Sequence, residues 1–150
     1  SELIDFGVDK VILGTLAVEN SKLLEEACKK FNKKIVISLD ARQGYIALSG
    51  WRNQTKILAL DFIKKVEHLN ISRIIYTDIN RDGTKLGPNI DETVKLSNST
   101  KTPVFISGGI SSIKDVVSIK EKNFKNIEGI IIGKAIYDGS INIKELSEII

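Results

Sequence analysis

Methionine is absent from the 150-residue chain, and cysteine, histidine and tryptophan occur once each. A single cysteine cannot form an internal disulfide, and one histidine without cysteine partners excludes the clusters that hold zinc, so we expect no metal site. Cys28 lies within an apolar helical pattern, which indicates a buried and unreactive thiol. A lack of disulfides is typical of a reducing compartment, so we expect the protein in the cytoplasm.

Long apolar stretches and several common catalytic motifs are also missing. No run approaches the roughly 20 apolar residues of a membrane-spanning helix, and no segment has the pattern of an export signal, so no membrane partner is expected. The G-x-S-x-G elbow and the G-x-x-x-x-G-K-S/T phosphate loop do not occur. The opening residues, SELIDFGVDK, read as the end of a helix followed by a strand, so we expect the chain to begin within a larger fold.

Neither sign of charge dominates: Lys and Arg number 22, Asp and Glu number 19, and the net charge is +3 at pH 7. The lysines are spread over helical segments and do not cluster with aromatic residues, which argues against a nucleic-acid partner. A small positive excess suits an anionic small molecule instead. Hydrophobic residues at 42% and charged residues at 27% are ordinary values for a domain with one core.

The sequence does contain a repeated alternation of apolar runs and helical patterns. The runs are continuous, as expected for parallel strands that are buried on both faces. Between them, apolar residues recur at helical spacing, and helix starts are expected at Ser112 with Asp115 and at Asn142 with Glu145. The expected strands are 11–13, 35–39, 73–76, 104–106 and 129–132, and the expected helices are 20–31, 56–69, 89–99 and 112–122.

This order predicts one α/β domain over residues 1–150, built from five parallel βα units with right-handed crossovers and a helical remnant before the first strand. The longest interruption runs from residue 43 to residue 55 and contains Gly44, Gly50 and Trp51. We expect it to form a long loop that is partly a β-hairpin. Long loops in compact domains are often functional.

Polar and glycine residues follow every predicted strand, at the edge where α/β folds bind their ligands. Because the carboxyl ends of parallel strands meet at one edge, these residues are expected to converge on a common site. In strand order they are Gly14 and Thr15; Asp40, Ala41 and Arg42; Thr77, Asp78, Arg81, Asp82, Gly83 and Thr84; Ser107, Gly108 and Gly109; and Gly133 and Lys134.

The glycines after the last two strands predict a phosphate site. Gly108, Gly109 and Gly133 allow close backbone approach, so that N–H groups can point at an anion. A short helix is expected after Gly133, with Lys134 at its start, which is a recurring arrangement for phosphate binding. Tight turns are the alternative interpretation of these glycines, and for Gly14 taken alone we favour it.

Asp40 and Asp82 are the carboxylates best placed for acid–base chemistry. A carboxylate at a strand end can be partly desolvated, so that it holds or releases a proton near neutral pH. Asp-Gly is a common turn pair, so Asp82 has a structural alternative, whereas Asp40 serves no obvious turn. Thr77 can bind substrate or cap the following loop, and Asp78 should point toward the helices in a structural role.

Other candidates for substrate or phosphate binding at this edge are Arg42, Gly83 and Thr84. Trp51 lies in the polar stretch SGWRNQ, where it either stacks on a planar ligand group or folds the loop onto the body of the domain. The sequence favours neither interpretation. His68 is expected at the surface near the end of a helix.

Six stretches together resemble the ProFAR isomerase family of histidine biosynthesis: GVDKVILGTLAVEN, VISLDAR, SGW, IIYTDINRDGTKLGPN, PVFISGGISS and GIIIGKAIYDG. They run in order through nearly the whole chain. The sister family of that pathway, the cyclase subunit of imidazole glycerol phosphate synthase, shares the DA, RDGT and SGG features. The SGW stretch and YTDINRDGT with GPN favour the isomerase over this alternative.

The resemblance implies a (β/α)8 barrel that carries out an Amadori rearrangement of an aminoaldose with two phosphates, without a metal or organic cofactor. It implies that Asp40 is a proton donor, that Asp82 is a second acid and that Thr77 assists. It also implies that Trp51 packs on the substrate. The implied phosphate residues are Gly108, Gly109, Gly133 and Lys134 for one phosphate, and Gly14 and Thr15 for part of the other.

The family has eight βα units, and this chain supplies what resemble units four to eight. The first three strands, with the aspartate thought to act as general base, would lie outside it. Five units cannot close an eight-stranded barrel, so we expect an open, flavodoxin-like sheet, or exposed edges that self-associate or bind the missing N-terminal units. The alternative to an enzyme part is a non-catalytic module that binds phosphorylated ligands.

Overall fold

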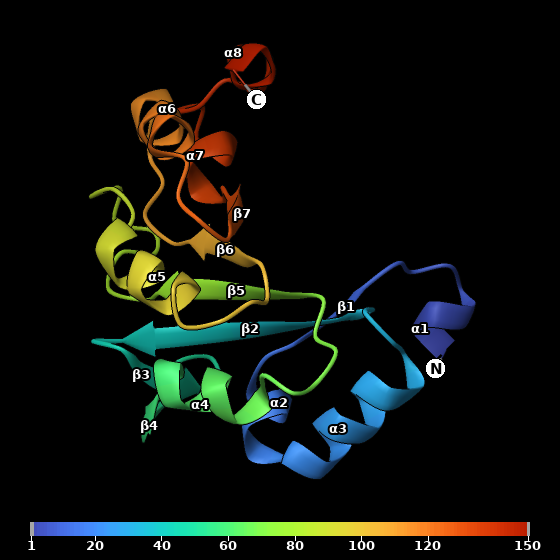
Figure 1. Ribbon diagram of the computed structural model, residues 1–150. Coiled ribbons are helices and arrows are strands. Elements are labelled where there is room, and N and C mark those ends of the chain that lie inside the picture. The colour runs from blue at the N-terminus through green and yellow to red at the C-terminus, as the bar shows by residue number, and fades with distance from the viewer. Residues whose placement is uncertain (1, 150) are drawn as a thin grey trace.

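Seven strands form one sheet in the computed structural model, which describes residues 2–149 (Figure 1). Five of them are parallel and follow the apolar runs, in the spatial order β1–β2–β5–β6–β7. Ile and Val dominate these runs, because β-branched side chains pack well on a pleated surface. The five strands are β1 (Val11–Leu13), β2 (Ile35–Arg42), β5 (Arg73–Asp78), β6 (Val104–Ser107) and β7 (Ile127–Ile131).

The expected ends of three strands come too early and are wrong: Ser107 is predicted to follow a strand but is the last residue of β6, and β2 and β5 extend further still. Asp40, Ala41 and Arg42 are predicted to follow a strand, but they belong to β2, and Thr77 and Asp78 belong to β5. The reason is that the two strands continue their pairing through Asp40 with Thr77 and Ala41 with Asp78. Backbone pairing therefore carries both strands to the rim of the sheet, where polar side chains are tolerated.

The expected hairpin is present in the long connection after β2. Strands β3 (Tyr45–Leu48) and β4 (Asn53–Leu58) are antiparallel, and β3 pairs with the end of β2. The helix predicted over 56–69 is wrong at its start, because residues 56–58 complete β4. Helix α4 begins only at Ala59 (Ala59–Val66), where the Ala59 N–H donates to the Gly44 carbonyl (2.9 Å).

Three other helices begin directly after residues whose side chains cap them, Asn20, Asn89 and Ser112. Asn20 accepts a hydrogen bond from the Leu23 N–H (3.0 Å), and Ser112 with Asp115 forms the expected capping box. No helix within residues 2–149 has both the length and the apolar character needed to cross a bilayer. Besides α4, the helices are α1 (Glu2–Asp5), α2 (Thr15–Glu19), α3 (Ser21–Lys30), α5 (Ile90–Ser97), α6 (Ile113–Lys122), α7 (Lys134–Tyr137) and α8 (Ile143–Ile149).

Helices α3 to α6 cover one side of the curved sheet and leave the other side open (Figure 1). On the covered side, Leu39 of β2 and Tyr76 of β5 share an apolar cluster with Leu24 and Cys28 of α3 and Phe62 of α4. Burial raises the pKa of the Cys28 thiol, which confirms the expected buried cysteine. Successive side chains of a strand point to opposite faces, so the alternate residues project from the open face.

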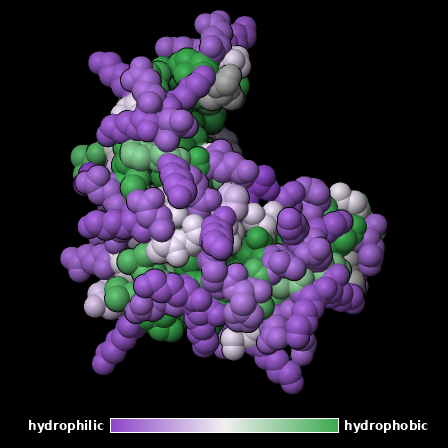
Figure 2. All heavy atoms as spheres, in the orientation of Figure 1, coloured by the Kyte–Doolittle hydropathy of each residue, from purple (hydrophilic) through white to green (hydrophobic). Residues whose placement is uncertain are grey.

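The sheet is open at both edges, as expected for five units. Within residues 2–149, β1 pairs only with β2, and β7 pairs only with β6. Figure 2 shows the molecule hollowed on one side, between its upper and lower parts. Large apolar side chains are exposed at both ends of the chain; they are Leu3, Phe6, Val8, Ile12 and Leu16 up to α2, and Ile131, Tyr137 and Ile143 from β7 onward.

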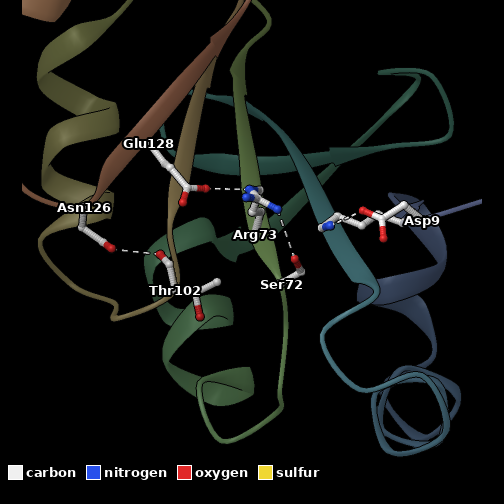
Figure 3. Close-up of polar contacts among 7 residues, drawn as sticks. Asp9, Ser72, Arg73, Thr102, Asn126 and Glu128 are labelled. Carbon is white, nitrogen blue, oxygen red and sulfur yellow. Dashed lines mark hydrogen bonds and ion pairs between the residues drawn. The ribbon is translucent and has the colours of Figure 1, made fainter.

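An ion pair links β5 to β7 near the N-terminal ends of the parallel strands, away from the rim formed by their carboxyl ends (Figure 3). Arg73 of β5 donates to Glu128 of β7 (2.6 Å), and its guanidinium lies over the ring of Phe105 on the intervening strand (5.6 Å to the centroid). The pairing of β6 with β7 shifts by one residue here. A bulge of this kind turns a side chain to the other face, and it directs Glu128 toward Arg73.

Candidate active site

One row of paired residues crosses the open face near the carboxyl ends of the strands. Asp40 of β2 pairs with Thr77 of β5, Thr77 with Ser107 of β6, and Ser107 with Ile131 of β7. Residues paired in a parallel sheet project from the same face, so a carboxylate and two hydroxyls lie side by side. The structure therefore brings Asp40 and Thr77 together at the rim where such folds bind ligands.

Trp51 folds onto Asp40 from the tip of the hairpin, and its indole N–H donates to Asp40 Oδ2 (2.7 Å). Thr15 Oγ1 holds this tip by accepting from the Ser49 N–H (2.9 Å). Ser49, Gly50 and Trp51 all have positive φ (55°, 65° and 68°), a conformation that residues with a side chain keep only where contacts enforce it. Thr15 therefore has a structural contact beside its expected phosphate role.

Thr15→Val should release the hairpin tip, because valine keeps the side-chain shape but removes the acceptor for Ser49. Trp51 is the only tryptophan, so the fluorescence anisotropy of the chain reports its mobility. We expect lower anisotropy and stronger acrylamide quenching in Thr15→Val, and wild-type values in Thr15→Ser, which keeps the hydroxyl. Equal anisotropy in all three proteins would show that Thr15 does not hold the tip.

A small cavity lies beside this row at Ser107 and Ile131. It is lined by four residues that we call the glycine cradle: Gly108, Gly109, Gly133 and Lys134. The cavity has a volume of about 90 Å³, which suits a small anion. The structure thus brings the ends of the last two strands together at one small hollow. The other lining residues are Asp82, Gly83, Lys85, Ser107, Ile110, Ile131 and Ala135.

The 79–88 loop, which connects β5 to α5, carries Asp82 to the rim of this cavity. The N–H groups of Arg81 and Asp82 both donate to the Asp78 carbonyl (3.0 Å each). Thr84 Oγ1 donates to the Arg81 carbonyl (2.7 Å). Asp82 is exposed and lines the cavity, whereas Thr84 is engaged within the loop and does not line it.

Sequence reasoning missed a polar cluster on the helix-covered side, beneath this loop. Asp78 faces the helices as expected, and its Oδ2 accepts from Asn89 Nδ2 (2.6 Å), which also donates to Glu92 Oε2 (2.9 Å). Burial raises the pKa of Glu92, and burial with the nearby Glu92 charge raises that of the Tyr76 hydroxyl. The signal that could have shown this cluster is Asn89-x-x-Glu92, the spacing of a helix cap.

A second missed contact joins the 79–88 loop to the segment after α7. Lys85 Nζ pairs with Asp138 Oδ2 (2.6 Å) and donates to Ser140 Oγ (2.8 Å). Hydrogen bonds from Lys85 and Ser140 lower the pKa of Asp138 to about 2. Both ends of this contact lie in stretches that have the composition of turns, so no local pattern indicates the pair.

Gly14 and Arg42 are further candidate residues that do not line the cavity. Gly14 precedes α2, and a Cβ at its position would lie 3.9 Å from the Ser38 carbonyl, so it remains at the same rim beside β2. Arg42 lines a separate surface hollow at the base of the hairpin.

His68 is exposed beyond the end of α4, as predicted. Among residues 2–149, no three His, Cys, Asp or Glu residues are grouped so as to hold a metal ion.

Parallel βα units whose polar and glycine residues gather at the carboxyl edge of the sheet are the features of (β/α)-barrel folds. Residues 1–142 match the family described as histidine biosynthesis protein. The chain belongs to that family.

Its relatives are longer than the chain. A protein of Pelagibacter ubique is 55% identical over 143 residues, which are 95% of this chain and 59% of the relative. Proteins of Clostridium novyi and Thermodesulfovibrio yellowstonii are each 45% identical, over 95% and 99% of this chain and 59% and 60% of the relatives. All three relatives are named as isomerases of an imidazole-4-carboxamide that carries two phosphoribosyl groups. The chain thus spans about three fifths of the length of these relatives.

Proposed function

We propose that this chain supplies the acid side and one phosphate site of an isomerase that converts the aminoaldose ProFAR into its aminoketose. The observation that carries the proposal is Asp40, bound by Trp51 and set in one row of paired residues with Thr77 and with Ser107, which lines the cavity of the glycine cradle. The names of the relatives support the substrate class, a doubly phosphoribosylated imidazole carboxamide.

The proposed reaction is an Amadori rearrangement. An acid protonates the ribose ring oxygen, the C1–O bond breaks, and the sugar opens to a Schiff base. A base removes the proton from C2, and the resulting enolamine gains a proton at C1 and loses the proton of its C2 hydroxyl, so that C2 becomes the ketone. Asp40 donates the first proton beside the Thr77 hydroxyl, and Asp82 acts as second acid from the cavity rim. Positioned acids and bases suffice for these steps, so no cofactor is required.

We assign the two phosphates of the substrate to two parts of the rim. The glycine cradle binds one, with Lys134 as the positive charge. Gly14 and Thr15 bind part of the other. The Thr15 hydroxyl accepts from Ser49 and can still donate its own hydrogen to a phosphate oxygen. A net charge of +3 favours such an anionic ligand.

We infer that further βα units complete the site and contribute the general base. Both edges of the sheet are open and carry exposed apolar side chains, and the relatives are longer than this chain. Three more units pairing with β1 and β7 would close an eight-stranded barrel. Self-association through the same edges is the competing outcome. We place the enzyme in the cytoplasm, where the lone Cys28 stays reduced.

The test is conversion of ProFAR by the chain combined with the N-terminal units of the Pelagibacter ubique relative. We expect turnover by the wild-type combination and about a thousandfold lower kcat for Asp40→Asn, because general acid–base catalysis contributes roughly 10²–10⁴-fold. Asp61→Asn, on the exposed surface of α4, is the matched control and should keep wild-type turnover. Equal turnover by Asp40→Asn would contradict the assignment of the acid. Association and phosphate binding without turnover would favour the non-catalytic module.

A further inference from the structure

Three side chains join the 79–88 loop to the segment after α7. Lys85 Nζ lies 2.6 Å from Asp138 Oδ2 and donates to Ser140 Oγ at 2.8 Å. Ser140 donates to Asp138 Oδ1 from its hydroxyl (2.6 Å) and from its backbone N–H (3.1 Å). These bonds orient the carboxylate independently of Lys85. The ammonium therefore meets a fixed acceptor, whereas most exposed ion pairs must order two mobile side chains.

The backbone of the loop is also constrained at this contact. Lys85 has a φ of 59°, in the left-handed region that residues with a Cβ seldom occupy. Such a conformation persists only where surrounding contacts enforce it, and it concentrates at binding and catalytic sites. The contact with Asp138 is of the kind that enforces it, because it fixes where the Lys85 side chain must point.

The contact lies at the wall of the cavity that the glycine cradle lines. Lys85 and Asp82 both line this cavity, and Lys134 Nζ approaches the Gly83 carbonyl (3.4 Å) across it. The loop is therefore attached to the α7 region at two points just after Asp82, through Gly83 and through Lys85. Loss of the Lys85 contact would let Asp82 move relative to the cradle.

We propose that Lys85 is a positioning residue, which, by binding Asp138 and Ser140, holds the 79–88 loop and Asp82 against the glycine cradle. The nature of the bound anion and the role of Asp82 rest on the proposed function. The attachment of the loop does not, since it is a property of the folded chain.

Replacement of Asp138 separates this proposal from simple charge attraction. Asp138 is an anion close to a cavity that is proposed to bind an anion. Electrostatics alone therefore predicts that Asp138→Asn strengthens phosphate binding. If Asp138 acts by holding Lys85, Asp138→Asn instead weakens binding, and adding Lys85→Met to it changes little more.

The test uses the 150-residue chain with inorganic phosphate as the probe. Calorimetry gives the Kd, and NMR hydrogen exchange follows the Asp82 and Thr84 amides, which are bonded within the loop. We expect about tenfold weaker phosphate binding and about tenfold faster exchange in Lys85→Met and in Asp138→Asn. Lys85→Arg keeps the charge and the reach and should restore both values.

Lys29→Met and Glu25→Gln are the matched controls, because they remove an exposed ion pair of the same kind (2.8 Å) on α3. They should change neither measurement. Tighter phosphate binding by Asp138→Asn, or unchanged amide exchange in both site variants, would overturn the proposal. If the wild-type chain binds no phosphate, the proposed phosphate site fails, and the exchange measurement alone decides whether Lys85 positions the loop.

Discussion

Gly109→Ala is expected to destabilise the chain by about 3 kcal/mol and to disrupt the glycine cradle. A Cβ at this position would lie 2.5 Å from the Gly87 carbonyl oxygen and 2.9 Å from Arg81 Cβ. Neither atom can move away without displacing the backbone of the 79–88 loop. Gly109 also has a φ of 83°, which L-residues rarely adopt. Steric conflict and backbone strain therefore act together at one position.

Two further glycines separate these causes. Gly83 has a φ of 68° in the same loop but nothing within 4 Å of an added Cβ, so Gly83→Ala should show the strain alone. We expect that strain to cost about 1 kcal/mol. Gly133→Ala meets nothing within 4 Å and should leave the free energy of unfolding unchanged. Urea unfolding measures all three variants. Equal losses in Gly109→Ala and Gly83→Ala would show that the loop does not press on the cradle.

The predictions that the structure confirms rest on local signals. Continuous apolar runs marked all five parallel strands. The burial on both faces that these runs predicted is wrong for β1 and β7, where Ile12 and Ile131 are exposed. The capping box is likewise a local signal, because its two residues, Ser112 and Asp115, lie within four consecutive positions of the sequence. The grouping of Gly108, Gly109 and Gly133 around one cavity could be predicted because parallel strands end at a common edge, whereas their binding of phosphate stays a prediction.

The features that the sequence could not predict depend on residues far apart in the chain. Asp40 extends β2 because it pairs with Thr77, and nothing in the neighbourhood of Asp40 indicates that partner. Ile57 fits a helical spacing, yet its segment pairs with β3 and becomes a strand. The contact of Lys85 with Asp138 has the same character, since each residue alone has the appearance of a polar turn position.

Asn89→Asp is expected to destabilise the chain by about 3 kcal/mol at neutral pH, although the two side chains have nearly the same shape. The Asn89 amide donates to Asp78 (2.6 Å) and to Glu92 (2.9 Å), and Asp78 is only 4% exposed. Aspartate would remove both donated hydrogen bonds and place a third negative charge between two carboxylates. Because Asp78 and Asn89 flank the 79–88 loop, the same change would release the loop that carries Asp82.

This loss should depend on pH, and the sign follows from the direction of the pKa shifts. Burial already raises the pKa of Glu92, and a third carboxylate beside it would raise that pKa further. A carboxyl group with a raised pKa keeps a proton in the folded chain that the unfolded chain has released. The variant therefore loses stability as the pH rises through the raised pKa. Its deficit relative to wild type should be small near about pH 4 and grow toward about pH 7.

Asn20→Asp is the matched control, because the Asn20 side chain caps α3 in the same way but lies on the exposed surface. Aspartate is as good a cap as asparagine, so this variant should stay within about 0.5 kcal/mol of wild type. Asn89→Ala removes the donor without adding a charge, and we expect a loss of about 2 kcal/mol that depends less on pH than the loss in Asn89→Asp. If Asn89→Asp shows the same loss and the same pH dependence as Asn89→Ala, charge repulsion is not the cause. The cluster would then hold the two ends of the loop by hydrogen bonding alone.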